Sequence, residues 1–282
     1  MNLTIQPSDN QQWLSNRTSR SALLHKKWDL IYLVRHDEIF MPEEGELHFF
    51  DAKWEKGIEW YKKHFTPAEN EQLLGEKTPA YCYLPAMPER INSVVPEVKL
   101  VWIFRNPIER AYSNYWHSVR VGLEPLGFDD ALRREEQRLE ESLWYGYAKR
   151  GRYAEQLERF LKYYDHSSMF FALFEDLIEE PKSVLVDLLN FLEVDVSREI
   201  TRPPVKANPS YNYHSKWIQY AARRLFGRGR LPFRVVSRLN QKSTPGYPPM
   251  SEQARSYLRD YFRPLNQRLA VLTNLDLSGW ES

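Results

Sequence analysis

The stretch KLVWIFRNPIERAYSNYWHSVR, residues 99–120, decides the fold of this chain. Residues 99–104 form a continuous apolar run of the kind found in a strand buried on both faces. Asn106 can then cap a helix, Pro107 suits its first position, and Glu109 completes a capping-box spacing. The segment therefore predicts a buried strand, a tight turn and a helix.

A second unit of the same kind follows later in the chain. An apolar run at 169–174 predicts another buried strand, and apolar residues recur at helical spacing over 181–192. The stretch 54–65 also has a helical pattern, whereas 129–145 is expected to be a charged helix with a solvated face. Strands that alternate with helices favour an α/β fold, with a parallel sheet flanked by helices on both faces.

The length of the chain indicates one large domain. Its 282 residues are 42% hydrophobic, which is enough to bury a sizeable core. Residues 1–27 are polar, lack glycine and show no sustained period. We therefore expect an N-terminal arm over residues 1–27 and a single domain over residues 28–282.

The cysteine content bears on the compartment and on metal binding. Cys82 is the only cysteine, which excludes an intrachain disulfide framework and a cysteine-rich zinc site and fits a reducing compartment. No apolar run approaches the roughly 20 residues needed to cross a bilayer. We expect a cytoplasmic protein that is neither secreted nor anchored by a transmembrane segment.

Charge is balanced overall but unevenly distributed. The 39 lysines and arginines nearly cancel the 38 acids, which gives no indication of a nucleic-acid partner, and no motif indicates an oligomeric state. Between Glu199 and Glu252 there are ten bases and no acid. This basic stretch is consistent with a face for an acidic polysaccharide, a lid over donor phosphates, an amphipathic helix that contacts a membrane surface, or a simply solvated face.

Arg105 and Ser113 are candidates for phosphate binding. In an open parallel sheet the ligand lies beyond the carboxyl ends of the strands, which is where Arg105 falls. Ser113 lies two helical turns later, so a guanidinium and a hydroxyl could hold one phosphate. Alternatively, Arg105 pairs with Glu109 and Ser113 only packs. The residues by themselves leave both interpretations open.

The run RNPIERAYSNYWH resembles the 3′-phosphate motif of sulfotransferases that use 3′-phosphoadenosine 5′-phosphosulfate (PAPS). Further phrases agree in order, among them ELHFFD at 46–51, GEKTPAY at 75–81 and FEDLIEEP at 174–181. The resemblance covers roughly residues 28–280 and is strongest to the bacterial and heparan-sulfate-type carbohydrate sulfotransferases. It implies the P-loop-like sulfotransferase fold.

The resemblance also implies a reaction and its residues. The co-substrate would be PAPS, without a metal, and the acceptor a hydroxyl or amine of a small molecule or, more specifically, of a glycan. Arg105 and Ser113 would bind the 3′-phosphate. Glu46 would be the catalytic base, with His48 as a second candidate, and Lys77 would lie near the transferred group.

The chain departs from the family pattern near its start. Sulfotransferases open with a strand and a glycine-containing loop that holds the 5′-phosphosulfate, yet the first glycine here is Gly45. Lys26 and Lys27 supply charge at that place without matching the family lysine by position. Two explanations compete: an N-terminus that has been lost or replaced, or a catalytically degenerate relative. The alternative function is therefore a sulfotransferase-like protein that binds a nucleotide or an anionic glycan.

Overall fold

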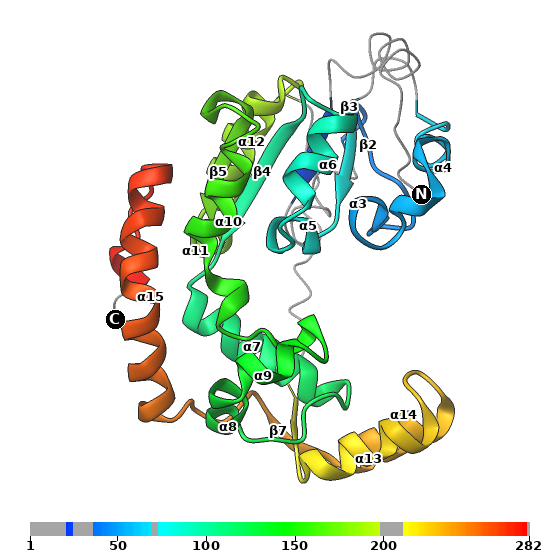
Figure 1. Ribbon diagram of the computed structural model, residues 1–282, viewed down its shortest axis with the longest axis vertical. Helices are drawn as coiled ribbons and strands as arrows, with labels where there is room; N and C mark the ends of the chain where they lie inside the picture. Colours follow the sequence, from blue (N-terminus) through cyan, green and yellow to red (C-terminus); the bar gives the residue numbers. More distant parts are fainter. Residues whose placement is uncertain (1–20, 25–35, 69–72, 198–210, 281–282) are drawn as a thin grey trace. The chain divides into compact units, whose positions relative to one another are not determined.

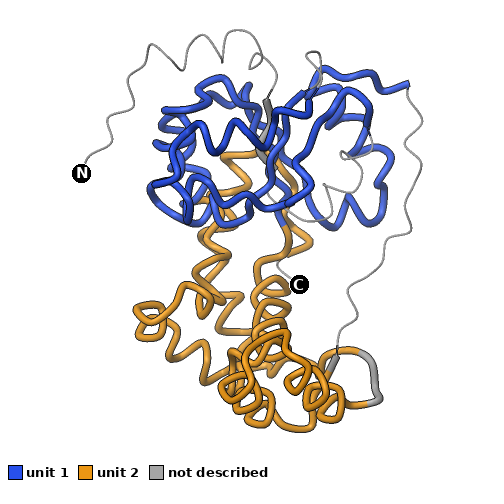
Figure 2. The backbone as a smooth tube through the Cα atoms, turned by 90° about the vertical axis from the view of Figure 1, so that its right-hand side faces the viewer, with its two compact units in different colours: residues 1–104, 155–204 blue, residues 105–154, 205–282 orange. Residues whose placement is uncertain are grey.

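The computed structural model describes residues 21–24, 36–68, 73–197 and 211–280 (Figure 1). The chain divides into two compact units, which Figure 2 distinguishes by colour. Unit 1 comprises residues 1–104 and 155–204, and unit 2 comprises residues 105–154 and 205–282.

Unit 1 is built on a parallel sheet. Its five strands have the order β2-β3-β1-β4-β5 and all pair in parallel. They are β1 (Ser21–Leu24), β2 (Ile39–Phe40), β3 (Leu73–Lys77), β4 (Lys99–Phe104) and β5 (Met169–Leu173). The two strands predicted from their apolar runs are confirmed as β4 and β5, which pair from Leu100 opposite Met169 to Phe104 opposite Leu173.

Strand β1 corrects the interpretation of residues 1–27 as an arm. Ser21–Leu24 lie in the middle of the sheet, between β3 and β4, with Leu24 opposite both Lys77 and Val101. A strand of four residues is too short to show an alternating pattern in its sequence. Hydrogen bonds to its two parallel neighbours hold it in the extended conformation instead. Residues 1–20 of the predicted arm, and the loop position of Lys26 and Lys27, lie outside the described residues.

Both faces of the sheet are covered by helices, as the sequence predicted. Val101 and Ile103 of β4 belong to a core cluster with the leucines of α12 (Pro181–Leu192). Trp102 points to the opposite face, because side chains alternate along a strand, and its ring lies 5.1 Å from that of Phe160 in α10 (Tyr153–Phe160).

The remaining helices of unit 1 are short. They are α3 (Phe49–Ala52), η1 (Trp54–Lys56), α4 (Ile58–Lys63), α5 (Ala80–Tyr83), α6 (Met87–Val94), η4 (His166–Ser168) and α11 (Phe174–Glu179). The helical pattern at 54–65 is thus present as η1 and α4. Gly57, with φ 75°, separates the two because only glycine adopts that backbone conformation without strain.

Unit 2 is mainly helical and is organised around α7 (Pro107–Arg120). Asn106 caps this helix as predicted, since its side-chain oxygen accepts hydrogen bonds from the backbone N–H groups of Ile108 (3.0 Å) and Glu109 (3.4 Å). The other elements are α8 (Phe128–Arg133), α9 (Glu135–Leu139), η2 (Leu143–Tyr145), η3 (Lys149–Gly151), β6 (Tyr211–Tyr213), α13 (Lys216–Phe226), α14 (Leu231–Leu239), β7 (Gln241–Pro245), α15 (Glu252–Thr273) and η5 (Ser278–Trp280). Strands β6 and β7 form an antiparallel pair.

The expectation of one solvated helix over 129–145 is wrong. The stretch forms α8, α9 and η2, and Glu135 is buried at the start of α9. Its carboxylate accepts hydrogen bonds from the backbone N–H groups of Ala148 (2.9 Å) and Lys149 (2.8 Å). A charged sequence pattern does not reveal such a partner, because the two N–H groups come from a later turn of the chain.

No helix within the described parts of the chain is long and apolar enough to span a bilayer.

Candidate functional site

Strand β3 carries two charged residues into the interior of unit 1. Glu76 and Lys77 are both almost completely buried, and as neighbours on a strand they point to opposite faces of the sheet. Gly75 precedes them, and a side chain at that position would collide with Met41. Buried charged groups are unfavourable unless they are paired. We therefore take these two residues and the side chains around them as the candidate site.

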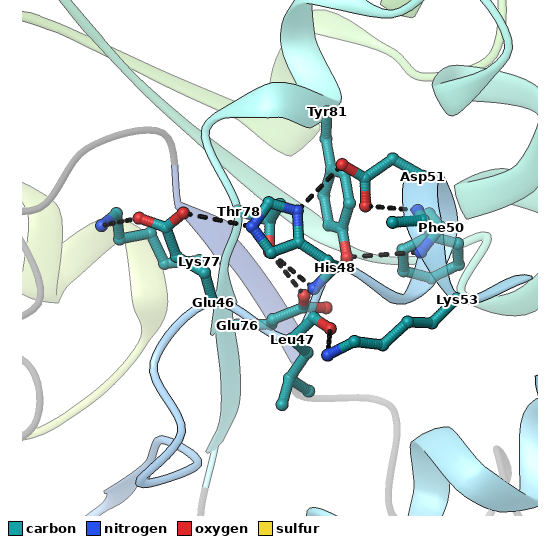
Figure 3. A network of polar contacts seen from close by, with 11 residues as sticks. Glu46, Leu47, His48, Phe50, Asp51, Lys53, Glu76, Lys77, Thr78 and Tyr81 are labelled. Atoms are coloured by element: carbon teal, nitrogen blue, oxygen red, sulfur yellow. Dashed lines mark hydrogen bonds and ion pairs between the residues drawn. The ribbon is translucent and has the colours of Figure 1, made fainter. Parts of the chain in front are cut away.

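Glu46 supplies the partner of Lys77. The Nζ of Lys77 lies 3.2 Å from Oε1 of Glu46, which belongs to the segment between β2 and α3 (Figure 3). The side chain of Lys77 is only 2% exposed, whereas that of Glu46 is 42% exposed. The pair therefore joins a buried cation to a carboxylate that solvent or an acceptor can reach.

His48 completes a row of charged groups with these two residues. Its Nε2 lies 3.4 Å from Oε2 of Glu46, and its Nδ1 lies 2.9 Å from Oδ2 of Asp51. The residue has a left-handed backbone conformation, with φ 55°, just before α3. Such a conformation is uncommon for a residue other than glycine, and here it directs the imidazole between two carboxylates.

A buried carboxylate supports this row. Glu76 accepts hydrogen bonds from the hydroxyls of Tyr61 (2.7 Å), Tyr81 (2.7 Å) and Thr78 (3.0 Å). Burial raises the pKa of Glu76, and these three hydrogen bonds oppose the rise because they favour the ionised form. Burial likewise raises the pKa of Tyr61 and of Tyr81, with the nearby Glu76 carboxylate adding to both shifts.

The supporting network also contacts the segment that carries Glu46 and His48. The Oγ1 of Thr78 also accepts a hydrogen bond from the backbone N–H of His48 (3.3 Å), and the hydroxyl of Tyr81 accepts one from that of Phe50 (3.3 Å) (Figure 3). Lys53 donates to the carbonyl of Leu47 (2.7 Å). The segment that carries Glu46 is thereby held to β3 and α5.

The structure thus brings together Glu46, His48 and Lys77, three residues that the sequence placed in the site. It adds two that sequence reasoning missed, Asp51 and Thr78. Both lie inside the phrases that carried the resemblance, and the three-residue spacing from His48 to Asp51 was an available signal for a contact across one helical turn.

In unit 2, Arg105 and Ser113 lie on the segment that the sequence assigned to phosphate binding. Arg105 follows the last residue of β4, Ser113 lies on α7, and both are half-buried. The alternative partner of Arg105 is engaged elsewhere: the Oε1 of Glu109 lies 3.1 Å from Nη2 of Arg255.

The sequence did not predict the aromatic pair formed by Trp116 and Tyr247 in unit 2. Burial raises the pKa of Tyr247, while the positive charges of Arg120 and Arg105 oppose that rise. The Tyr247 ring stacks on Trp116, with 5.3 Å between centroids. Trp116 belongs to the hydrophobic core of unit 2, and Tyr247 packs against it.

Comparisons with known proteins identify the family of this chain. The profile of the sulfotransferase domain matches residues 28–222, more than half of the chain. The chain belongs to the sulfotransferase family. This confirms the resemblance seen in its sequence. The described residues of this sulfotransferase domain contain no cluster of three side chains able to hold a metal ion.

Several known proteins are similar to this chain. It is 26% identical over 84% of its length to heparan sulfate glucosamine 3-O-sulfotransferase 3B1 of mouse, and 27% identical over 84% to heparan sulfate glucosamine 3-O-sulfotransferase 6 of human. The chain spans 57% and 65% of the length of these two proteins.

A solved structure supports the fold. A sulfotransferase from Alicyclobacillus acidocaldarius superimposes with a TM-score of 0.71, covering 93% of this chain and 99% of that one at 23% identity. The predicted fold class is thereby confirmed.

Proposed function

We propose that this protein transfers a sulfuryl group from PAPS to a hydroxyl or amine of a carbohydrate. The observation that carries the proposal is the row formed by Lys77, Glu46 and His48. It places a reachable carboxylate beside a buried ammonium group, and these are the base and the cation that sulfuryl transfer requires.

In the proposed reaction, Glu46 removes the proton of the acceptor group as the acceptor oxygen or nitrogen forms its bond to sulfur. The bond between sulfur and the bridging phosphate oxygen breaks, and its electron pair stays with the departing nucleotide. Lys77 offsets the negative charge that develops on these oxygens, because a cation in a buried position acts strongly on nearby charge. His48, held by Asp51, orients Glu46 or takes its place as the base.

Arg105 and Ser113 are proposed to hold the 3′-phosphate of the donor. A guanidinium and a hydroxyl are suitable donors for a phosphate, and both side chains are half-buried rather than enclosed. The positive charges of Arg105 and Arg120, which oppose the rise in the pKa of Tyr247, add to the attraction for an anion. The residues present therefore fit a nucleotide that carries a 3′-phosphate.

The carbohydrate acceptor is proposed from the relatives, whose names specify heparan sulfate glucosamine. Within the chain, the exposed carboxylate of Glu46 is the feature that supports an acceptor arriving from solvent.

Binding of the desulfated product, 3′-phosphoadenosine 5′-phosphate, tests the donor site. We expect it to raise the unfolding temperature of the purified chain, with about 2.7 kcal/mol of added stability at 100 times its Kd. AMP, which lacks the 3′-phosphate, is the control ligand. Equal stabilisation by both nucleotides, or by neither, would remove the donor assignment.

Transfer of radiolabelled sulfate from PAPS tests the reaction itself. Heparan sulfate and its desulfated forms are the acceptors to examine first, with a chain carrying Glu46→Gln as the inactive comparison. If the chain binds the nucleotide or heparan sulfate in a salt-sensitive manner but labels no acceptor, the catalytically degenerate alternative is supported instead.

A further inference from the structure

Helices α13 and α14 form a hairpin whose outer surface is unusually apolar. They lie side by side and are the yellow helices of Figure 1. Leu225, Leu231 and Leu239 are 77%, 70% and 78% exposed. Trp217, Ile218 and Val235 are exposed as well. A cluster of large exposed apolar side chains on two neighbouring helices indicates a surface that contacts a membrane or another molecule.

These side chains form stripes rather than a scatter. On α14, Leu231, Val235 and Leu239 recur every four residues and so occupy one side of the helix. On α13, Trp217, Ile218 and Leu225 lie within about 100° of one another around the helix axis. Each helix is therefore amphipathic with its apolar side exposed, the reverse of what folding alone would favour.

The opposite side of the hairpin is fixed in unit 2. The fully buried amide of Gln219 donates to the carbonyl of Arg120 at the end of α7 (2.9 Å) and to the hydroxyl of Ser237 on α14 (2.6 Å). Arg223 donates to the carbonyl of Val121 (2.8 Å). The exposed stripes are thus a stable feature of the surface and not the result of a loosely attached helix.

Positive charge borders the stripes. Arg234 and Arg238 are exposed on α14 beside the leucine stripe, and Arg228 and Arg230 lie in the connection between the helices. The hairpin lies within the segment between Glu199 and Glu252, which contains ten bases and no acid. A surface with this charge is complementary to an anionic partner.

We propose that the α13–α14 hairpin docks this protein on an anionic lipid surface, with its apolar stripes in the interfacial region and its arginines at the headgroup phosphates. An acidic glycan would satisfy the arginines but would leave the three leucines in water. A lipid interface satisfies both, because an amphipathic helix rich in arginine can lie with its apolar side about 5–10 Å below the headgroups. The inference is independent of the proposed reaction.

Flotation of the full chain with lipid vesicles tests the proposal. We expect it to float with vesicles made of equal parts phosphatidylcholine and phosphatidylglycerol, to bind poorly to phosphatidylcholine alone, and to dissociate as salt is raised. Absence of binding to the anionic vesicles at low salt would overturn the proposal.

Paired variants separate the apolar and charged contributions. Leu231→Ser with Leu239→Ser should weaken binding to anionic vesicles at least about 10-fold. Arg234→Gln with Arg238→Gln should weaken it about 30-fold at low salt. All four side chains are exposed, so the variants should fold, which the unfolding temperature checks.

Matched controls lie elsewhere on unit 2. Val271→Ser removes an apolar side chain that is 85% exposed on α15, and Arg134→Gln with Arg263→Gln removes the same net charge. These variants should float like the unchanged chain. If they lose as much binding as the hairpin variants, or if the leucine variants convert a dimer into a monomer and leave vesicle binding intact, the surface is not a lipid site. Heparin binding that requires the arginines, with vesicle binding indifferent to the leucines, would identify a glycan face instead.

Discussion

Two glutamate–cation pairs, one in each compact unit, differ in how far they are withdrawn from solvent. In unit 1, Glu46 pairs with Lys77 at 3.2 Å, and the carboxylate side is substantially exposed. In unit 2, Glu124 pairs with Arg138 at 2.7 Å and is completely buried. A glutamate–cation pair therefore includes a solvent-accessible carboxylate in unit 1, whereas the carboxylate of the pair in unit 2 is inaccessible to solvent.

The further partners of Glu124 reinforce this difference. Its carboxylate also accepts hydrogen bonds from the hydroxyl of Tyr147 (2.7 Å) and the backbone N–H of Leu126 (3.0 Å). A buried charge satisfied on all sides holds its surroundings in one arrangement, whereas an exposed carboxylate can exchange a proton with another molecule. We therefore expect substitutions in the first pair to affect both turnover and stability, because Lys77 is buried, and those in the second to affect stability alone.

Glu46→Gln should have the largest effect. If Glu46 is the base, turnover in sulfate transfer should fall about 10²- to 10⁴-fold, since glutamine cannot accept the proton. The free energy of unfolding should fall as well, because the side chain of Lys77 is only 2% exposed and loses the charge that compensates it. Turnover is therefore compared at a temperature at which the variant remains folded. Rates of radiolabelled transfer check this prediction, with the exposed neighbour Glu44→Gln as control. Unchanged turnover in Glu46→Gln would remove the assignment.

Glu124→Gln should lower the free energy of unfolding by about 3 kcal/mol, because it leaves Arg138, whose side chain is 12% exposed, without its compensating charge. Denaturant titration measures the loss. The matched control is Glu136→Gln, which breaks the exposed pair with Lys149 and should cost less than about 1 kcal/mol. Equal costs for the two variants would show that burial does not distinguish these pairs.

Arg105→Ala separates binding from chemistry. It should weaken binding of 3′-phosphoadenosine 5′-phosphate by about 1.5–3 kcal/mol, the value of a hydrogen bond to a charged group, and should leave AMP binding unchanged. Calorimetric titration of both nucleotides measures the difference, and Arg133→Ala, on the exposed surface of α8, is the control. A parallel loss for AMP would show that Arg105 does not recognise the 3′-phosphate.

Asn106→Ala should have the smallest effect, a loss of about 1 kcal/mol in unfolding free energy, because two N–H groups at the start of α7 lose their acceptor. Asn106→Asp should recover most of this stability, since aspartate also caps helices. If Asp restores nothing, the cap contributes little, and α7 owes its start to packing. Thermal unfolding of the two variants decides between these outcomes.

The part of the site that could be predicted is the part encoded by local pattern. Arg105 lies directly after a recognisable strand and Ser113 lies on the capped helix that follows, so both were candidates from local pattern. The resemblance to a family then assigned them, together with Glu46 and Lys77, to the proposed site. The buried hydroxyl network could not be predicted in this way. Tyr61 lies on α4 and Glu76 on β3, so the role of Tyr61 depends on a contact between two elements that are 15 residues apart in the sequence.

The sequence alone determined the segment from β4 to α7. A long apolar run and a side-chain cap act within a few residues and need no distant partner. Only the tertiary structure decided the place of β1 in the sheet, because four residues acquire their hydrogen bonds from β3 and β4 far along the chain. The tertiary structure also decided which charged residues are buried. The sequence around Glu124 and Glu46 does not indicate that one is buried and the other exposed, because burial depends on residues that are distant in the sequence.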